Sequence, residues 1–214
     1  MRAVGILALQ GDFDAHRRAV EETGMPAVLV RSRREMDGVC GLVIPGGEST
    51  TLLKLARDFD LLAAIDDLHA RGAPILGTCA GAILVARRVI GPEQESLGLI
   101  DITIERNAYG RQKDSFETTV SLPEEAARWT GGDRSPMDLV FIRAPRIRSC
   151  EASVDVMLRL AGEPILVRQE GVIACTFHPE MSADRRVHAF FCAEAAGTPR
   201  PASSRGGALS GAVS

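Results

Sequence analysis

Long apolar runs are missing from this sequence of 214 residues. A membrane-spanning helix needs roughly 20 consecutive apolar residues, and no stretch approaches that length. The first segment, Met1–Leu7, is apolar but short, and it lacks the small-residue cleavage pattern of a signal peptide. We therefore expect a cytoplasmic protein whose first segment is a buried strand.

An excess of charge of one sign is missing as well. Charged residues make up 25% of the chain, and the formal net charge is −3. Proteins that bind nucleic acid or an anionic membrane surface usually carry a basic field, which this balance excludes. The composition is typical of an ordinary protein surface.

Closely spaced cysteine pairs and aromatic residues are scarce. The five cysteines are odd in number and widely spaced, without a C-x-x-C pair. This pattern argues against a disulfide framework and against a structural zinc site, so we expect no metal. Aromatic residues are 4% of the chain and hydrophobic residues 45%, so aliphatic side chains must fill most of the core.

Apolar strands alternate with amphipathic helices in the first half of the chain. The expected strands are Val4–Leu9, Pro26–Val30, Gly41–Ile44 and Pro74–Gly77. The expected helices are Phe13–Glu22 with Asp12 as its N-cap, Ser49–Arg57 with Ser49 as its cap, Leu61–Arg71 and Ala80–Arg87. This alternation predicts a three-layer α/β fold, in which helices cover both faces of a mainly parallel sheet.

Strands dominate the second half of the chain. We expect them at Leu99–Glu105, Ser115–Ser121, Asp138–Arg143, Ser153–Leu160, Pro164–Gln169 and Val172–Phe177, followed by a closing helix at Ala183–Ala195. These strands should add antiparallel edge strands to the sheet, so that residues 1–197 form a single domain. Residues 198–214 are rich in Pro, Ser, Gly and Ala, and we expect a disordered tail.

The strongest local motif is Gly77-Thr78-Cys79-Ala80-Gly81, between a buried strand and a helix. It has the G-x-nucleophile-x-G form of a strand-to-helix elbow. The positive end of the following helix favours a thiolate at Cys79, and the Ala80 amide is free to donate to a developing oxyanion. Taken alone, the motif is equally compatible with a buried structural cysteine before a close-packed helix.

The other four cysteines lack such a setting. Cys40 stands at a strand start, Cys150 in a polar loop and Cys175 inside an apolar strand. Cys192 falls among apolar residues of the closing helix. We expect all four to be structural, as buried free cysteine usually is.

A cysteine nucleophile needs a histidine base and a group that orients the histidine. His178 ends an apolar strand and is followed by Pro179 and Glu180. Residues i and i+2 of an extended segment point to the same side, and the proline between them stiffens it, so Glu180 can reach the imidazole. These residues predict the triad Cys79, His178 and Glu180, although a strand-end histidine beside an unrelated glutamate would look the same.

The remaining histidines have less suitable surroundings for a base. His16 lies beside Arg17 and Arg18 in the first helix and is expected at the surface. His69 lies near a helix end, where a cation suits the helix dipole. His188 lies in the closing helix.

Together these residues resemble the class I, or triad, glutamine amidotransferases, and most of all the glutaminase subunits of pyridoxal 5'-phosphate synthase. The segments that carry the resemblance are residues 5–12, 42–51, 77–81, 106–112, 141–145 and 177–180. Pro-Gly-Gly-Glu-Ser-Thr-Thr at 45–51 and Arg-Asn-Ala-Tyr-Gly-Arg-Gln at 106–112 are the most specific of them. The resemblance implies a flavodoxin-like α/β sheet and an enzyme without a cofactor.

The resemblance also implies a role for each site residue. Cys79 would attack the side-chain amide of glutamine, His178 would move the proton to the leaving ammonia, and Glu180 would orient His178. The implied glutamine site consists of Gly47, Glu48, Ser49, Arg106, Ile142 and Arg143, with the amides of Gly47 and Ala80 as oxyanion donors. The residue types suit these roles, because glycine turns an amide cheaply and arginine binds both oxygens of a carboxylate.

A partner is implied by the same resemblance. Ammonia would pass to a pyridoxal 5'-phosphate synthase (lyase) subunit in a hetero-oligomeric complex. Gln10 ends the first strand, near the carboxyl edge where α/β sites lie, so we expect it to face the synthase or to take part in activation. Because a free glutaminase would waste L-glutamine, activity should depend on complex formation.

Other functions stay open on the sequence alone. A triad glutaminase subunit of another pathway would keep Cys79, His178 and Glu180 and change only the partner. A cysteine-elbow α/β peptidase or a redox sensor would keep the fold and the reactive cysteine. A binding module that kept the fold is disfavoured, because all three members of the triad are present.

Overall fold

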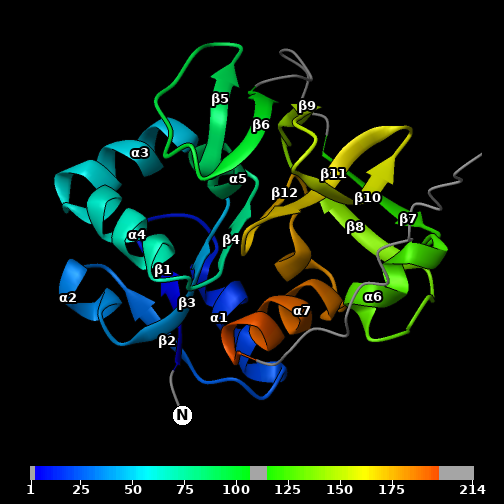
Figure 1. Cartoon of the computed structure of the whole chain (residues 1–214), viewed down its shortest axis with the longest axis horizontal. Helices are drawn as coiled ribbons and strands as arrows, with labels where there is room; N and C mark the ends of the chain where they lie inside the picture. The colour runs from blue at the N-terminus through cyan, green and yellow to red at the C-terminus, as the bar shows by residue number, and fades with distance from the viewer. Residues whose placement is uncertain (1–2, 107–114, 198–214) are drawn as a thin grey trace, which may run out of the picture.

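Seven strands form the central sheet within residues 3–106 and 115–197, the part of this computed structural model that can be described (Figure 1). They are β1 (Ala3–Leu7), β2 (Ala27–Val30), β3 (Val39–Ile44), β4 (Ile75–Thr78), β10 (Asp155–Leu160), β11 (Glu163–Gln169) and β12 (Val172–Cys175). Their order across the sheet is β10-β11-β12-β4-β3-β1-β2.

Strands β12, β4, β3, β1 and β2 run parallel, whereas β10 and β11 add antiparallel strands at one edge. The predicted mainly parallel sheet with antiparallel edge strands is therefore confirmed. The parallel strands are short apolar runs because both of their faces are covered. Since they all point the same way, their carboxyl ends meet at one edge of the sheet.

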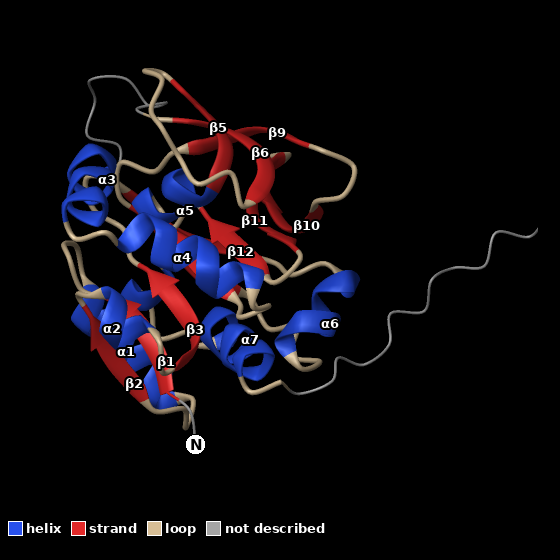
Figure 2. Ribbon diagram, turned by 60° about the vertical axis from the view of Figure 1, so that its left-hand side comes forward, coloured by secondary structure: helices blue, strands red, loops and turns tan. Residues whose placement is uncertain are grey.

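Helices cover both faces of the central sheet (Figure 2). In β3, Leu42 and Ile44 point into one core and Val43 into the other, following the two-residue period of a strand. The first core is closed by α2 (Arg33–Met36), α3 (Ser49–Asp58), α4 (Leu61–Ala70) and α5 (Ala80–Val85). The second is closed by α1 (Phe13–Glu22), α6 (Ala127–Thr130) and α7 (Arg186–Ala195). The result is the predicted three-layer arrangement.

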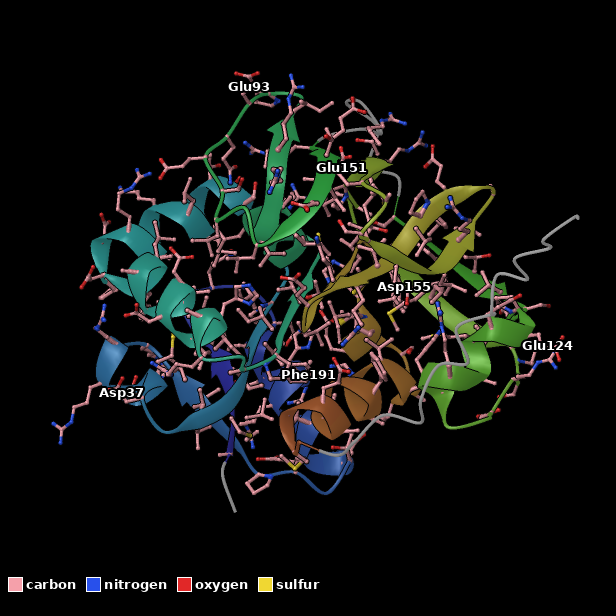
Figure 3. The ribbon with its side chains drawn as sticks, viewed as in Figure 1. Asp37, Glu93, Glu124, Glu151, Asp155 and Phe191 are labelled. Atoms are coloured by element: carbon pink, nitrogen blue, oxygen red, sulfur yellow. The ribbon has the colours of Figure 1, made fainter. Side chains whose placement is uncertain are left out.

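Side-chain burial follows these layers (Figure 3). Phe191 of α7 is fully buried in the second core. The acidic side chains of Asp37, Glu93 and Glu124 instead lie exposed at the margin of the molecule. Aliphatic residues dominate both cores, as the low aromatic content predicts.

Two smaller sheets lie beside the central one, so the strands expected at Leu99–Glu105, Ser115–Ser121 and Asp138–Arg143 do not join its edge as β10 and β11 do. One contains β5 (Ala86–Ile90), β6 (Ile100–Glu105) and β9 (Arg146–Cys150), and the other is the hairpin of β7 (Phe116–Val120) and β8 (Met137–Phe141). Each buries one face only, β5, β6 and β9 against the first core and β7 and β8 against the second. Phe116 stacks on Phe141 at 4.7 Å between ring centroids.

Several element boundaries differ from the sequence prediction. The helix expected at Ala80–Arg87 ends at Val85, because the chain becomes extended at Ala86, where β5 begins. All six residues of the helix are buried. Helix α7 begins at Arg186 rather than Ala183, after the 3₁₀ turn Pro179–Met181. Cys150 ends strand β9 rather than lying in a loop.

The predicted disordered tail, residues 198–214, and residues 107–112 of the Arg-Asn-Ala-Tyr-Gly-Arg-Gln segment lie outside the described residues. The segment between 121 and 136 contains the 3₁₀ turn Glu124–Ala126 before α6. Among the described residues, every helix is too short or too polar to cross a membrane.

Replacing Gly81 with alanine should destabilise the protein, although alanine is the better helix former. A Cβ at this position would lie 2.0 Å from the carbonyl oxygen of Ile44, so the backbone must shift. We expect a loss of about 1–3 kcal/mol in the free energy of unfolding, measured by urea denaturation. The control is Gly38→Ala, where no atom lies within 4 Å. Equal stability of the two variants would show that the close approach at Gly81 is not a constraint.

Candidate active site

The candidate site lies at the carboxyl edge of the central sheet, where four adjacent strands end. Gln10 follows β1, Gly47 follows β3, Cys79 follows β4 and His178 follows β12. Ligand sites of open α/β sheets form at this edge. The sheet order β12-β4-β3-β1 therefore brings together residues that are far apart in the sequence.

Cys79 sits at a strained turn between β4 and α5. Its backbone angles are φ 49° and ψ −102°, a conformation that side chains rarely adopt and that clusters at functional sites. The flanking glycines are required, because a Cβ on Gly77 would lie 2.7 Å from the Gly81 carbonyl oxygen. Cys79 is 5% exposed, and its amide donates to the Cys175 carbonyl oxygen at 2.9 Å.

His178 lies between Cys79 and Glu180. Its Nδ1 is 2.8 Å from Glu180 Oε1, while its buried Nε2 has no hydrogen-bond partner among the described residues. Gly46 packs closely against both His178 and Cys79. A Cβ on Gly46 would lie only 2.6 Å from His178 Cε1 and 3.3 Å from Cys79 Cβ. A thiol, an imidazole and a carboxylate are thus arranged in series, which is the arrangement of nucleophile, base and orienting group.

The electrostatics of this series favour an imidazolium. Burial alone lowers the pKa of His178, but the proximity of Cys79 and Glu180 outweighs it and raises the pKa to about 10. Burial raises the pKa of Glu180, yet His16 and His178 hold it well below its ordinary value. A carboxylate that stays ionised and an imidazole that holds its proton are suited to stabilising a neighbouring thiolate.

A small pocket opens onto Cys79 and His178, with a volume of about 110 Å³. Its lining consists of Gly47, Glu48, Ser49, Cys79, Ile83, Arg106, Ile142, Arg143, Pro145 and His178. Every residue of the predicted glutamine site is therefore on one pocket. Ile83 and Pro145 were not predicted, since an apolar residue carries no chemical signal in a sequence.

The Glu48 carboxylate contacts both the start of α3 and Arg106. Its carboxylate caps α3 by accepting from the amides of Thr50 and Thr51, so the cap is Glu48 and not Ser49 as predicted. Burial raises its pKa, but these amides and hydroxyls outweigh burial and lower it to about 2. Arg106 lies 3.6 Å away. The carboxylate is therefore an anion at neutral pH, facing the pocket.

Gln10 and Ala80 lie behind the pocket rather than on it. The Gln10 side chain accepts from the Glu48 amide at 3.1 Å and covers Gly47, whose φ is 134°. A Cβ on Gly47 would lie 2.5 Å from the Gln10 amide, so only glycine fits. Ala80 is fully buried at the start of α5.

His16 is the main error of the sequence prediction. It is completely buried rather than at the surface, and it lies 3.1 Å from Glu180 Oε2. His188 is buried beside it. The helical spacing of His16 with Ala19 and Val20, both buried, is the signal that places it on the inner face.

No group of three or more His, Cys, Asp or Glu within residues 3–106 and 115–197 is arranged to hold a metal ion. The side chains and backbone amides of the pocket carry a chemistry of their own. These supply a nucleophile, a proton carrier and donors for an anion.

Comparison with known proteins places the chain among amidotransferases. Residues 6–196 match the SNO glutamine amidotransferase family. A Kosmotoga olearia protein named pyridoxal 5'-phosphate synthase subunit PdxT is 44% identical over 195 residues, which cover 91% of this chain and 98% of that protein. Its Solibacter usitatus counterpart is 48% identical over 192 residues, which cover 89% and 98%. A crystal structure described as a glutamine amidotransferase is 41% identical, with a TM-score of 0.80 and coverage of 91% and 99%.

Two of the three buried histidines, His178 and His188, should have pKa values shifted in opposite directions. We expect His178 to stay protonated up to about pH 10, because Cys79 and Glu180 favour the imidazolium despite burial. His188 should stay neutral down to about pH 3, since burial and the nearby His16 lower its pKa. Nuclear magnetic resonance of ¹⁵N-labelled histidine measures both. In Glu180→Gln the pKa of His178 should fall, because an anionic acceptor is lost. Titration of wild-type His178 near its ordinary value of 6.5 would contradict this electrostatic account.

Proposed function

Because the chain belongs to the SNO glutamine amidotransferase family, we propose that it hydrolyses L-glutamine to L-glutamate and ammonia through Cys79, His178 and Glu180. The observation that carries this proposal is a single pocket lined by the proposed nucleophile, the proposed base and all six residues expected to bind the substrate. A structural cysteine would need neither the strained elbow nor the ionised carboxylate behind the histidine.

The first step forms a glutamyl thioester. The Cys79 thiolate attacks the carbon of the glutamine side-chain amide, and the carbonyl oxygen becomes an oxyanion. The amides of Gly47 and Ala80 donate to this oxyanion, whose charge exists only in the transition state and intermediate. When the carbon–nitrogen bond breaks, His178 gives its proton to the leaving nitrogen, which departs as ammonia.

The second step returns the enzyme to its starting state. His178, now neutral, takes a proton from water, which attacks the thioester carbon. Breaking the carbon–sulfur bond releases L-glutamate and regenerates the thiolate beside a protonated His178. Glu180 keeps Nδ1 of His178 as the donor in both steps, so that Nε2 always faces the reacting atoms.

The rest of the pocket recognises the amino-acid end of the substrate. The α-ammonium group of glutamine suits the Glu48 carboxylate, which is charged because its pKa is lowered to about 2. The α-carboxylate suits the guanidinium of Arg106 or Arg143, which can bind two oxygens. Ser49 and the backbone at Ile142 complete the contacts to the amino-acid end.

The released ammonia passes, in this proposal, to a synthase (lyase) subunit that makes pyridoxal 5'-phosphate. Support comes from the relatives, which are named as subunits of that synthase and match nearly the whole of this chain. Gln10 packs closely against Gly47 and accepts from the Glu48 amide, so a partner that docks on Gln10 would act on the backbone that carries the proposed oxyanion donor. The complex would act in the cytoplasm, and residues 1–197 would form its glutaminase domain.

The family and the relatives favour this function over the alternatives. A redox sensor has no use for the donors to an oxyanion, and a peptidase needs an open groove rather than a pocket of about 110 Å³. A glutaminase of another pathway would share the triad, but its similar proteins would be named as subunits of a different synthase.

Replacing Cys79 with alanine should abolish ammonia release while L-glutamine still binds. His178→Asn should lower kcat on the order of 10³-fold or more, as loss of a triad member does. Ammonia is measured by a coupled dehydrogenase assay with the synthase present, and binding by calorimetry. The control is Cys150→Ala, which changes a half-buried cysteine away from the pocket and should keep full activity. Normal turnover of Cys79→Ala would exclude the proposed nucleophile.

The cognate synthase should stimulate glutamine hydrolysis, and Gln10→Ala should weaken that stimulation. The reason is that Gln10 contacts both Gly47 and the Glu48 amide. Initial rates with and without the synthase measure the effect. Asp37→Ala, an exposed change away from the pocket, is the control and should respond like the wild type. An equal rate with and without synthase would point to a glutaminase of another pathway.

A further inference from the structure

A second layer of buried polar side chains lies behind Glu180. His16 Nε2 is 3.1 Å from Glu180 Oε2 and also 3.1 Å from Thr78 Oγ1, to which it is aligned for a hydrogen bond. His16 Nδ1 is 3.0 Å from His188 Nε2. All four side chains are buried, and they come from α1, β4, α7 and the turn after β12.

Glu180 holds two histidines at once, one on each carboxylate oxygen. Oε1 is 2.8 Å from His178 Nδ1. Oε2 is buried, and no donor among the described residues is aligned on it for a hydrogen bond; its contact is the ion pair with His16 Nε2 at 3.1 Å. A buried carboxylate oxygen without a donor is costly, so the second oxygen needs His16.

The His16 nitrogen that faces Glu180 must carry a hydrogen. Glu180 is ionised, and a bare nitrogen lone pair 3.1 Å from an anionic oxygen would repel it. When His16 carries its hydrogen on Nε2, its Nδ1 can accept from His188 Nε2–H. Burial lowers the pKa of His188 and keeps it neutral, which is the state this arrangement requires.

We infer that His16 is a positioning residue for the reaction, holding the second oxygen of Glu180 so that the first stays on His178. This inference rests on the proposed glutaminase function, because it concerns the orientation of the base in that reaction. His188 holds the opposite nitrogen of the His16 ring, and Thr78 contacts the same nitrogen as Glu180. Thr78 immediately precedes Cys79, so the same contact ties the carboxylate to the strand that carries the nucleophile.

The alternative is that His16 only fills the space between α1, β4 and α7. Two substitutions separate these roles, because both remove the ring and keep an amide of similar polarity. The amide nitrogen of glutamine reaches about the place of histidine Nε2, and that of asparagine about the place of Nδ1. His16→Gln can therefore still donate to Glu180, whereas His16→Asn can reach only His188.

The experiment compares His16→Gln and His16→Asn in the full chain, assayed for glutamine hydrolysis with the cognate synthase. His16→Asn should lose kcat by about 10- to 100-fold, the range seen when the outer partner of an oriented histidine is removed, and its KM should not change. His16→Gln should recover most of that kcat. The control is His69→Asn, a half-buried histidine on α4 outside the site, which should match the wild type. Thermal unfolding of all three variants accounts for any loss of folded protein.

A measurement on histidine tautomers tests the inference without activity. In ¹⁵N-histidine-labelled wild type, long-range nitrogen–proton correlations should show the hydrogen of His16 on Nε2. A bare Nε2, or equal kcat in His16→Asn and wild type, would overturn the inference. An inactive wild-type complex would instead overturn the proposed function, and the tautomer of His16 would still decide its contact with Glu180.

Discussion

Bare backbone contact around Cys79 is the constraint on which the rest of the site depends. The Ile44 carbonyl oxygen approaches Gly81 so closely that a Cβ on Gly81 would lie only 2.0 Å from it. Gly77 likewise lets β4 pack directly on the start of α5. Gly46 gives His178 the same close approach to the loop after β3. Because three segments touch without side chains between them, the strained turn at Cys79 is held in place and its sulfur faces the imidazole.

The buried carboxylate makes that contact chemically useful. A pocket lined by backbone and arginine alone would bind an anion and leave it unchanged. Glu180 adds a permanent negative charge behind His178, and the charge survives burial only because histidines stand on both of its oxygens. The same contacts that lower the free-energy cost of burying the Glu180 carboxylate also orient His178. A substitution that changes one of these effects therefore changes the other.

The sequence predicts the parts of the molecule that depend on local patterns. The parallel sheet follows from alternating apolar strands and helices, Cys79 from its small neighbours, and Glu180 from its i+2 spacing to His178. The position of His16 depends on α1 packing against α7, and its partner His188 is 172 residues away. A run of basic neighbours gave the opposite prediction, since a charged residue such as Arg17 points outward from the same turn.

The same limit explains the other differences. Ala80–Val85 has no polar face that would mark where the helix stops, so the start of β5 could not be placed. Ser49 is a good cap by residue type, but Glu48 reaches two amides and takes the role. Sheet membership in the second half is decided by which strands pair over long sequence distances, and the local strand pattern is the same in either case.

The pocket draws its two kinds of residue from different layers of the fold. Cys79 and His178 follow strands of the central sheet, whereas Arg106 follows β6 and Ile142 and Arg143 follow β8, in the two smaller sheets. Gly47, Glu48 and Ser49 follow β3 of the central sheet, so the substrate contacts come from all three sheets, whereas the nucleophile and the base come from one. A substitution in β6 or β8 can therefore alter the contacts to the amino-acid end of the substrate while the strands that carry the nucleophile and the base keep their positions.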